Sequence, residues 1–192
     1  MYDIIRLIFG VVILLVLVIV RKKKKKKIIP LIICVCFIIS AHFVPIENTF
    51  ITFDSAESAY DYYNLKNKEI QTVVSGNNCD LIVGLDTNKL SHIIFPKTRE
   101  GWKIGIASNT KNVYTYVGET FVVECYQYKN KPEYFISVYS LLGNDIDISD
   151  SQNTEFFHIE VDKQISKVYY GYIGAFPEDY ILYVNGIEVY LN

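Results

Sequence analysis

Two apolar stretches near the start of the chain are separated by a run of consecutive cations. The stretches cover residues 4–20 and 28–44, and the cations between them are Arg21, Lys22, Lys23, Lys24, Lys25, Lys26 and Lys27. An α-helix of either length measures roughly 25 Å, close to the hydrocarbon core of a bilayer at about 30 Å. The sequence therefore predicts two short transmembrane helices joined by a tight basic loop.

The basic loop also predicts how the chain crosses the membrane. Lysine and arginine beside membrane helices stay on the cytoplasmic side, where anionic lipids attract them. We therefore expect a two-pass protein of the cell membrane, with loop 21–27 inside and both the N-terminus and the chain after Pro45 outside. The alternatives are that stretch 4–20 only dips into the bilayer, that stretch 28–44 belongs to a cleaved signal peptide, or that the lysines bind lipids or a partner.

The net charge of −2 hides an uneven distribution of charge along the chain. Residues 1–44 hold eight basic groups and one acid, whereas the residues after them hold eleven basic groups and twenty acids. An acidic remainder, with the basic block confined between apolar stretches, excludes a nucleic-acid binder and a soluble cytosolic domain. The predicted organisation is a transmembrane hairpin at 1–44, in contact with membrane lipids, and an extracytoplasmic domain at 45–192.

The extracytoplasmic domain has the pattern of an α+β fold with mainly antiparallel strands and one short helix. The helix is expected at 55–64, because Asp54 followed three residues later by Glu57 forms a capping-box pattern. Near the end of the domain, Asn185-Gly186 predicts a type I′ hairpin turn that places Leu182 opposite Val189. Strands are expected at 49–53, 69–75, 79–85, 91–95, 102–107, 113–117, 121–128, 134–141, 155–161, 167–173, 180–184 and 187–191.

Candidates for catalysis are few in this domain. Its two histidines, His92 and His158, each lie in a strand-like run, where a lone histidine is more often structural than catalytic. No motif of a serine hydrolase, a zinc protease or a phosphate-binding loop is present in the sequence. We therefore expect a protein that is not an enzyme and uses no cofactor. The alternative is an envelope enzyme that works with acids such as Asp145 or Asp147.

An acidic segment at 144–150 contains the only candidate metal ligands. Asp145, Asp147 and Asp150 supply carboxylates close together, as a calcium loop does, but Asp150 stands where such a loop needs glycine and Phe156 where it needs an acid. The favoured interpretation is a solvated turn between strands, with weak calcium binding as the alternative.

Two cysteines fall in the predicted external domain. A disulfide between Cys79 and Cys125 is chemically permitted there. Each cysteine also lies on the apolar side of its predicted strand, so the competing interpretation is two buried, unpaired thiols.

Fifteen of the sixteen tyrosines follow Pro45. Tyrosine offers a large amphipathic contact area at a low entropic cost, so a tyrosine-rich surface is a hypothetical binding site for a protein or a wall glycan. The alternative is that these residues are simply good strand formers.

Three parts of the domain carry a resemblance to known proteins. The parts are the segment 50–60, which runs from an aromatic strand pattern into Asp54-Ser55-Ala56-Glu57, the Gly101-Trp102 pair, and the tyrosine-rich segments 169–173 and 180–186. Together they resemble a group of small membrane-anchored proteins of low-GC Gram-positive bacteria with a β-rich extracytoplasmic domain and no assigned function. Ala56 and Ser58 replace a proline and a glutamate of that group's helix start. The resemblance implies a location at the cell envelope and a β-rich fold.

We therefore expect a protein that displays a sensing or partner-binding domain at the cell envelope. Two alternatives remain. One is the envelope enzyme, and the other is an accessory or immunity-type subunit that is held in a larger membrane complex by its helices.

Overall fold

The computed structural model describes residues 45–64, 69–86, 89–105, 110–129, 131–161 and 167–191, together with Gly10 and Val12. The predicted membrane stretches and the basic loop therefore lie outside the described residues, apart from those two positions. Within the described ranges, no helix has the length and hydropathy that a membrane crossing needs.

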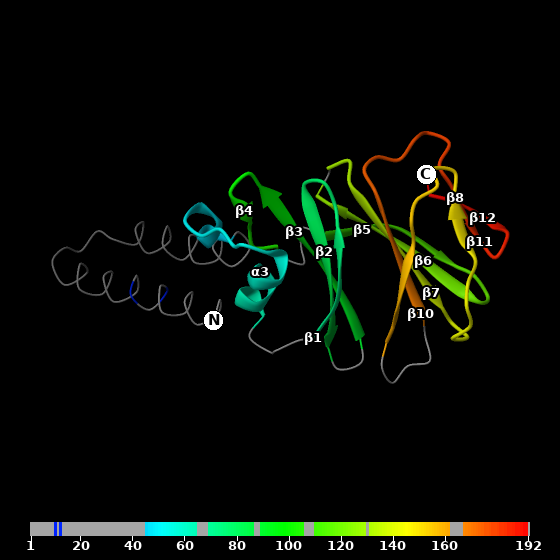
Figure 1. Cartoon of the computed structure of the whole chain (residues 1–192), viewed down its shortest axis with the longest axis horizontal. Coiled ribbons are helices and arrows are strands. Elements are labelled where there is room, and N and C mark those ends of the chain that lie inside the picture. The colour runs from blue at the N-terminus through cyan, green and yellow to red at the C-terminus, as the bar shows by residue number, and fades with distance from the viewer. Residues whose placement is uncertain are drawn as a thin grey trace, which may run out of the picture.

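The described domain is β-rich, with antiparallel sheets and one α-helix stacked in layers (Figure 1). Figure 1 shows helix α3 (Ala56–Tyr63), then a first, a second and a third sheet in succession along the long axis of the molecule. This arrangement confirms the predicted α+β class and the predicted antiparallel character of the strands.

Helix α3 packs on the outer face of the first sheet. Its N-cap is Ser55, whose hydroxyl accepts a hydrogen bond from the Ser58 amide at 3.2 Å, so the predicted cap at Asp54 lies one residue too early. The buried side of α3 contacts Ile82 and Phe95 of the sheet. The strands run in the order β1-β2-β3-β4, with bounds β1 (Glu69–Ser75), β2 (Cys79–Asp86), β3 (Lys89–Thr98) and β4 (Gly101–Trp102).

The second sheet lies between the other two and is covered on both faces. Along β6, Phe121, Val123 and Cys125 face the third sheet, whereas Tyr126 faces the first. A strand buried on both faces carries apolar residues at nearly every position, as β6, β7 and β10 do. The strand order is β5-β6-β7-β10-β9, with bounds β5 (Thr110–Val117), β6 (Phe121–Tyr128), β7 (Tyr134–Ser140), β10 (Lys167–Ile173) and β9 (Phe157–Glu160).

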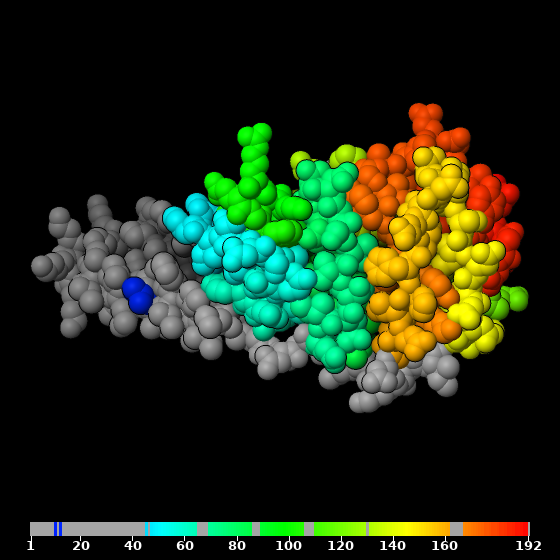
Figure 2. All heavy atoms as spheres, viewed as in Figure 1, coloured from blue at the N-terminus to red at the C-terminus, as the bar shows by residue number. Residues whose placement is uncertain are grey.

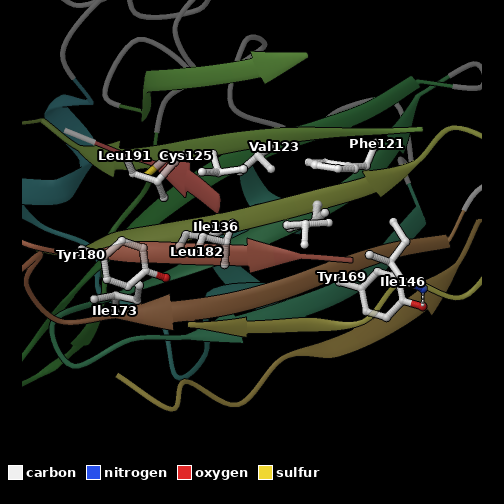
Figure 3. Close-up of a cluster of buried hydrophobic side chains, with 13 residues drawn as sticks. Phe121, Val123, Cys125, Ile136, Ile146, Tyr169, Ile173, Tyr180, Leu182 and Leu191 are labelled. Carbon is white, nitrogen blue, oxygen red and sulfur yellow. Dashed lines mark hydrogen bonds between the residues drawn. The ribbon is translucent and has the colours of Figure 1, made fainter. Parts of the chain in front are cut away.

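The third sheet is built on the predicted hairpin, and its register is confirmed. Leu182 pairs with Val189, and both Asn185 and Gly186 have positive φ, at 49° and 77°. Figure 3 shows Leu182 packed with Ile136 of β7 in a cluster that also holds Cys125. The strand order is β12-β11-β8, with bounds β11 (Ile181–Val184), β12 (Ile187–Tyr190) and β8 (Ile148–Asp150).

Three differences from the sequence predictions go beyond shifted element bounds. Of the segment expected as strand 49–53, Thr49 ends a 3-10 helix, η1 (Ile46–Thr49), and only Phe53 makes a strand-type bridge, to Trp102. The strand expected at 102–107 ends at Trp102, and its positions 106–107 lie outside the described residues. The cause is Asn48, whose side-chain amide bonds both backbone groups of Ile104, at 2.7 and 3.0 Å, in place of a neighbouring strand. Strand β8 was not expected, because its sequence belongs to the acidic segment.

The layers follow the sequence in two blocks. Residues 45–105 form α3 and the first sheet, which we call the N-terminal half, and residues 110–191 form the second and third sheets, the C-terminal half. The two halves meet where the first sheet packs on the second, through an apolar cluster that includes Leu81, Ile94 and Phe135. We call this contact the junction.

Candidate functional site

The junction contains a group of polar side chains inside its apolar cluster. We call it the His92 cluster; it consists of His92 on β3, Glu124 and Tyr126 on β6, Tyr139 on β7 and Tyr170 on β10. The strand registers bring these residues together, because Glu124 aligns with Ser137 and Ser137 aligns with Tyr170 across the second sheet. Alternation then places the four residues of the second sheet on one face, towards His92.

His92 is held by its ring face and by one ring nitrogen. Its imidazole stacks on Tyr126, with 4.4 Å between the ring centroids and 19° between the planes. The hydroxyls of Tyr170 and Tyr139 lie 3.1 and 3.4 Å from Nε2. Next to them, the Tyr126 hydroxyl donates to Glu124 Oε2 at 2.5 Å and lies 3.5 Å from the Tyr139 hydroxyl. These contacts link the first sheet to three strands of the second.

Burial sets the protonation state of this cluster. The His92 ring keeps a little exposed surface, yet the surrounding atoms displace most of its water, and this desolvation lowers its pKa to about 4. Burial also raises the pKa of Tyr126, Tyr139 and Tyr170 above the ordinary value for tyrosine. At neutral pH the cluster therefore holds a neutral imidazole and three protonated phenols, which suits hydrogen bonding between sheets rather than nucleophilic attack.

A second polar contact crosses the junction at Glu133. This carboxylate is only 4% exposed, and it accepts hydrogen bonds from the Asn78 amide at 3.1 Å, from Asn78 Nδ2 and from Cys79 Sγ at 2.9 Å. Burial, and then the hydrogen bond to Glu133, raise the pKa of Cys79 far above its usual range. The Cys79 thiol therefore stays protonated and serves as a hydrogen-bond donor, not as a nucleophile.

Cys79 and Cys125 are both free and buried, so no disulfide joins them. The reason is their placement: Cys79 belongs to the cluster between the first and second sheets, and Cys125 to the cluster between the second and third. Burial raises the pKa of Cys125 to about 12. Of the two interpretations of these cysteines, the structure matches the buried thiols.

The acidic segment does not gather its carboxylates. Asp145 is exposed and forms an ion pair with Lys167 at 2.5 Å, which lowers the pKa of that carboxyl. Asp147 is exposed beside the hairpin turn, whereas Asp150 is buried on β8 and accepts a hydrogen bond from the Tyr180 hydroxyl at 2.8 Å. In the part of the chain that the structure describes, no three His, Cys, Asp or Glu side chains are placed to hold a metal ion. The structure therefore gives no support to calcium binding by these three aspartates.

The tyrosines lie mainly inside the domain. Of the fifteen in the described domain, only Tyr190 is exposed, and the others are buried or half-buried. Tyr170 and Tyr180 are among the largest fully buried side chains. The tyrosine-rich sequence thus supplies the layers between sheets, and the hypothesis of a tyrosine-rich surface is not supported.

A different set of side chains is exposed at the end of the second sheet. Val117 is 71% exposed at the end of β5, and Leu141 and Leu142, just after β7, are 52% and 61% exposed. These segments are neighbours, because the Leu141 amide donates to the Thr120 carbonyl at 2.9 Å in the turn between β5 and β6. We call these three residues the apolar end.

Sequence reasoning found His92 but missed its partners. It treated His92 and His158 alike, yet His158 is exposed on β9, where its ring lies against that of Tyr169. The signal for Glu124 was present, since an acid inside the apolar strand β6 needs a polar partner. Glu133 lies in a turn and gave no signal.

Comparison with protein-family models, with curated proteins and with solved structures finds no match for this chain.

Proposed function

We propose that this chain is a membrane-anchored protein, not an enzyme, whose domain after Pro45 lies outside the cytoplasm and binds a protein partner through the apolar end. The observation that carries the proposal is the exposure of Val117, Leu141 and Leu142 side by side. Apolar side chains gathered on a surface are typical of interaction sites, because burying them against a partner is favourable.

The position of the apolar end supports this proposal. The described domain begins at η1, directly after the predicted stretch 28–44, and Figure 1 shows η1 and the turn between β5 and β6 at opposite ends of the domain. Figure 2 shows the segment after β7 near the same far end as that turn. A domain anchored through stretch 28–44 would therefore hold the apolar end away from the bilayer.

The other end of the domain has the character of a surface beside a membrane. Phe50, six residues after the predicted stretch ends at Val44, is 81% exposed, more than any other large apolar side chain of the described domain. An exposed aromatic ring at this position suits the interface between lipid headgroups and water. In the anchored arrangement, Phe50 would therefore lie at the membrane interface, and the apolar end would be free to contact a protein partner.

A protein partner fits the apolar end better than a wall glycan does. Sugar rings are commonly bound by aromatic faces and polar side chains, whereas valine and leucine offer only aliphatic surface. Since Tyr190 is the only exposed tyrosine of the described domain, we assign the partner to the protein class.

Photocrosslinking in whole cells tests the proposal. A photoreactive residue at Thr120, beside Leu141, should form adducts with a single protein, and one at the exposed Ser75 of β1 should not. Adducts from Thr120 should disappear in the double variant Leu141→Ser, Leu142→Ser, whose melting temperature should match that of the wild type. Adducts that survive this double variant, or that form equally from Ser75, would contradict a partner at the apolar end.

A further inference from the structure

We propose that the junction between the two halves opens in mild acid, when a proton enters the His92 cluster. The halves then separate while each keeps its own core. This inference concerns contacts inside the domain, so it holds on either side of a membrane and with or without a partner at the apolar end.

Hydrogen-bond polarity makes His92 the sensitive group. A neutral imidazole accepts a hydrogen bond at its unprotonated nitrogen, whereas an imidazolium carries N–H donors at both nitrogens. Nε2 lies 3.1 Å from the Tyr170 hydroxyl oxygen, and in the neutral ring it can accept a hydrogen bond from that hydroxyl. Once Nε2 is protonated, its N–H and the Tyr170 O–H are two donors that point at each other. Among the described residues, His92 is the only hydrogen-bond partner of the Tyr170 hydroxyl, and Tyr170 is fully buried. The displaced hydroxyl proton then has no acceptor within the closed junction.

The groups that face His92 from the other elements do not neutralise an imidazolium directly. Strand β6 presents Tyr126 and Glu124, β7 presents Tyr139 and β10 presents Tyr170, while the residue paired with His92 on β2 is Val83. The carboxyl of Glu124 is the only acidic side chain in this set, and its Oε2 accepts a hydrogen bond from the hydroxyl of Tyr126, whose ring stacks on the imidazole. A charged His92 is therefore stabilised less in the closed junction than in water.

The effect of pH follows from two protonation constants. In the closed junction the pKa of His92 is about 4, because burial disfavours the charged ring, whereas an open, hydrated histidine has a pKa near 6.5. The open state therefore binds the proton more tightly, and opening increases as the pH falls through 6.5. Below pH 4 both states are protonated, and the opening equilibrium levels off about 300-fold above its neutral value.

The fold allows the junction to open without loss of either half. The N-terminal half keeps the α3 contacts to Ile82, Ile93 and Phe95 on the far face of the first sheet. The C-terminal half keeps the cluster between the second and third sheets, to which the first sheet contributes no residue. Opening therefore exposes the junction cluster alone.

The two cysteines of the described domain report on this difference. Cys79 lies in the junction, and Cys125 lies in the core of the C-terminal half. The experiment treats the full chain in detergent with a dipyridyl disulfide, a reagent that reacts with thiols in acid, and mass spectrometry of peptides resolves the labelled positions. At pH 4.5, the Cys79 rate, normalised to that of denatured protein, should exceed its value at pH 7.5 by roughly 70-fold. Cys125 should stay protected.

Variants assign the response to His92. His92→Gln should keep Cys79 protected at pH 4.5, because the amide does not titrate, and His158→Gln should respond as the wild type does. If His92→Gln exposes both cysteines at neutral pH, His92→Phe serves in its place, since a phenyl ring preserves the stacking on Tyr126. Equal labelling of Cys79 and Cys125 in acid would show global unfolding and would overturn the proposal. An unchanged Cys79 rate in the wild type, or an acid response that persists without His92, would overturn it as well.

Discussion

At the scale of single residues, the buried Asp150 and Tyr180 show how this domain stabilises polar atoms in its interior. The Tyr180 hydroxyl donates to Oδ2 at 2.8 Å, and the amides of Gln152 and Thr154 donate to Oδ1 at 3.0 and 2.8 Å. A buried carboxylate is tolerated when its lone pairs are occupied in this way. The residue that resembled a calcium ligand in the sequence is thus a connector between β8 and the segment before β11.

Removing the Tyr180 hydroxyl should therefore destabilise the domain. For Tyr180→Phe we expect the free energy of unfolding to fall by about 1–3 kcal/mol, because Asp150 loses a partner that water cannot replace. The matched control is Tyr190→Phe, whose exposed hydroxyl bonds the exposed Glu188, and we expect it to be neutral. Chemical denaturation of the two variants measures the difference, and equal effects would contradict the role of the buried hydrogen bond.

The stability of the domain should also depend on pH through His92. Its folded pKa of about 4 lies below the unfolded value near 6.5, so the unfolded state takes up the proton first as the pH falls. The contribution to the free energy of unfolding is complete above pH 6.5 and decreases by up to about 3 kcal/mol on the way to pH 4.

Comparison with His92→Phe isolates this contribution. The variant should lack that part of the pH dependence, while the exposed His158 provides a control through His158→Gln. Urea denaturation at closely spaced pH values gives the two curves. A difference between wild type and His92→Phe that stays constant from pH 7 to pH 4 would contradict the assignment.

Much of the candidate site lay beyond prediction at this scale. His92 was singled out from the sequence, but its contact with Tyr170 joins residues 78 positions apart, and the contact of Cys79 with Glu133 joins residues 54 apart. Such pairs depend on how two sheets stack, and neither spacing nor alternation along one strand contains that information. The separation of the candidate metal ligands was hidden for the same reason, since Asp150 is buried at β8 whereas Asp145 is exposed.

At the scale of elements, local patterns predicted most strands. The hairpin of β11 and β12 has the expected register, because Asn185 and Gly186 adopt the positive φ that a type I′ turn requires. Strands β1, β6 and β10 match their predicted bounds. Errors occurred where a side chain took the place of a strand partner, as Asn48 does for Ile104, and where an acidic segment formed strand β8.

The contact between α3 and the first sheet depends on one glycine. A Cβ atom at Gly84 would lie 1.9 Å from the Tyr60 hydroxyl oxygen and 2.9 Å from its Cζ. Gly84→Ala should therefore lower the free energy of unfolding by about 1–3 kcal/mol, because the fully buried Tyr60 ring must shift. Adding Tyr60→Phe to this variant should recover part of the loss by removing the nearest atom.

The control for this prediction is Gly174→Ala. Its added methyl would meet no atom closer than 3.7 Å, and we expect no loss of stability. Thermal melting of the three variants provides the measurement. If Gly84→Ala melts with the wild type, α3 does not sit on the first sheet at the described distance.

At the scale of the whole molecule, the predicted topology has a direct test. Under the proposed orientation, Gln152→Cys, at an exposed turn, should react with a membrane-impermeant thiol reagent on intact cells. Lys24→Cys, in the basic loop, should react only after the cells are permeabilised, since the cation run is retained inside. The wild type gives the background from the four native cysteines, of which Cys79 and Cys125 are buried. If Lys24→Cys reacted on intact cells and Gln152→Cys reacted only after permeabilisation, the orientation would be the reverse of the proposed one.

The order in which the layers follow the sequence has a consequence for biogenesis. Strands β11 and β12 come after every strand of the second sheet, yet they cover the face formed by Phe121, Val123 and Cys125. During synthesis or export, that face therefore stays bare until the closing hairpin arrives, and exposed apolar strands of this kind are prone to aggregation. The N-terminal half can meanwhile complete its own hydrogen bonding. The vulnerable interval for this domain thus lasts from the completion of β10 until β11 and β12 have been added.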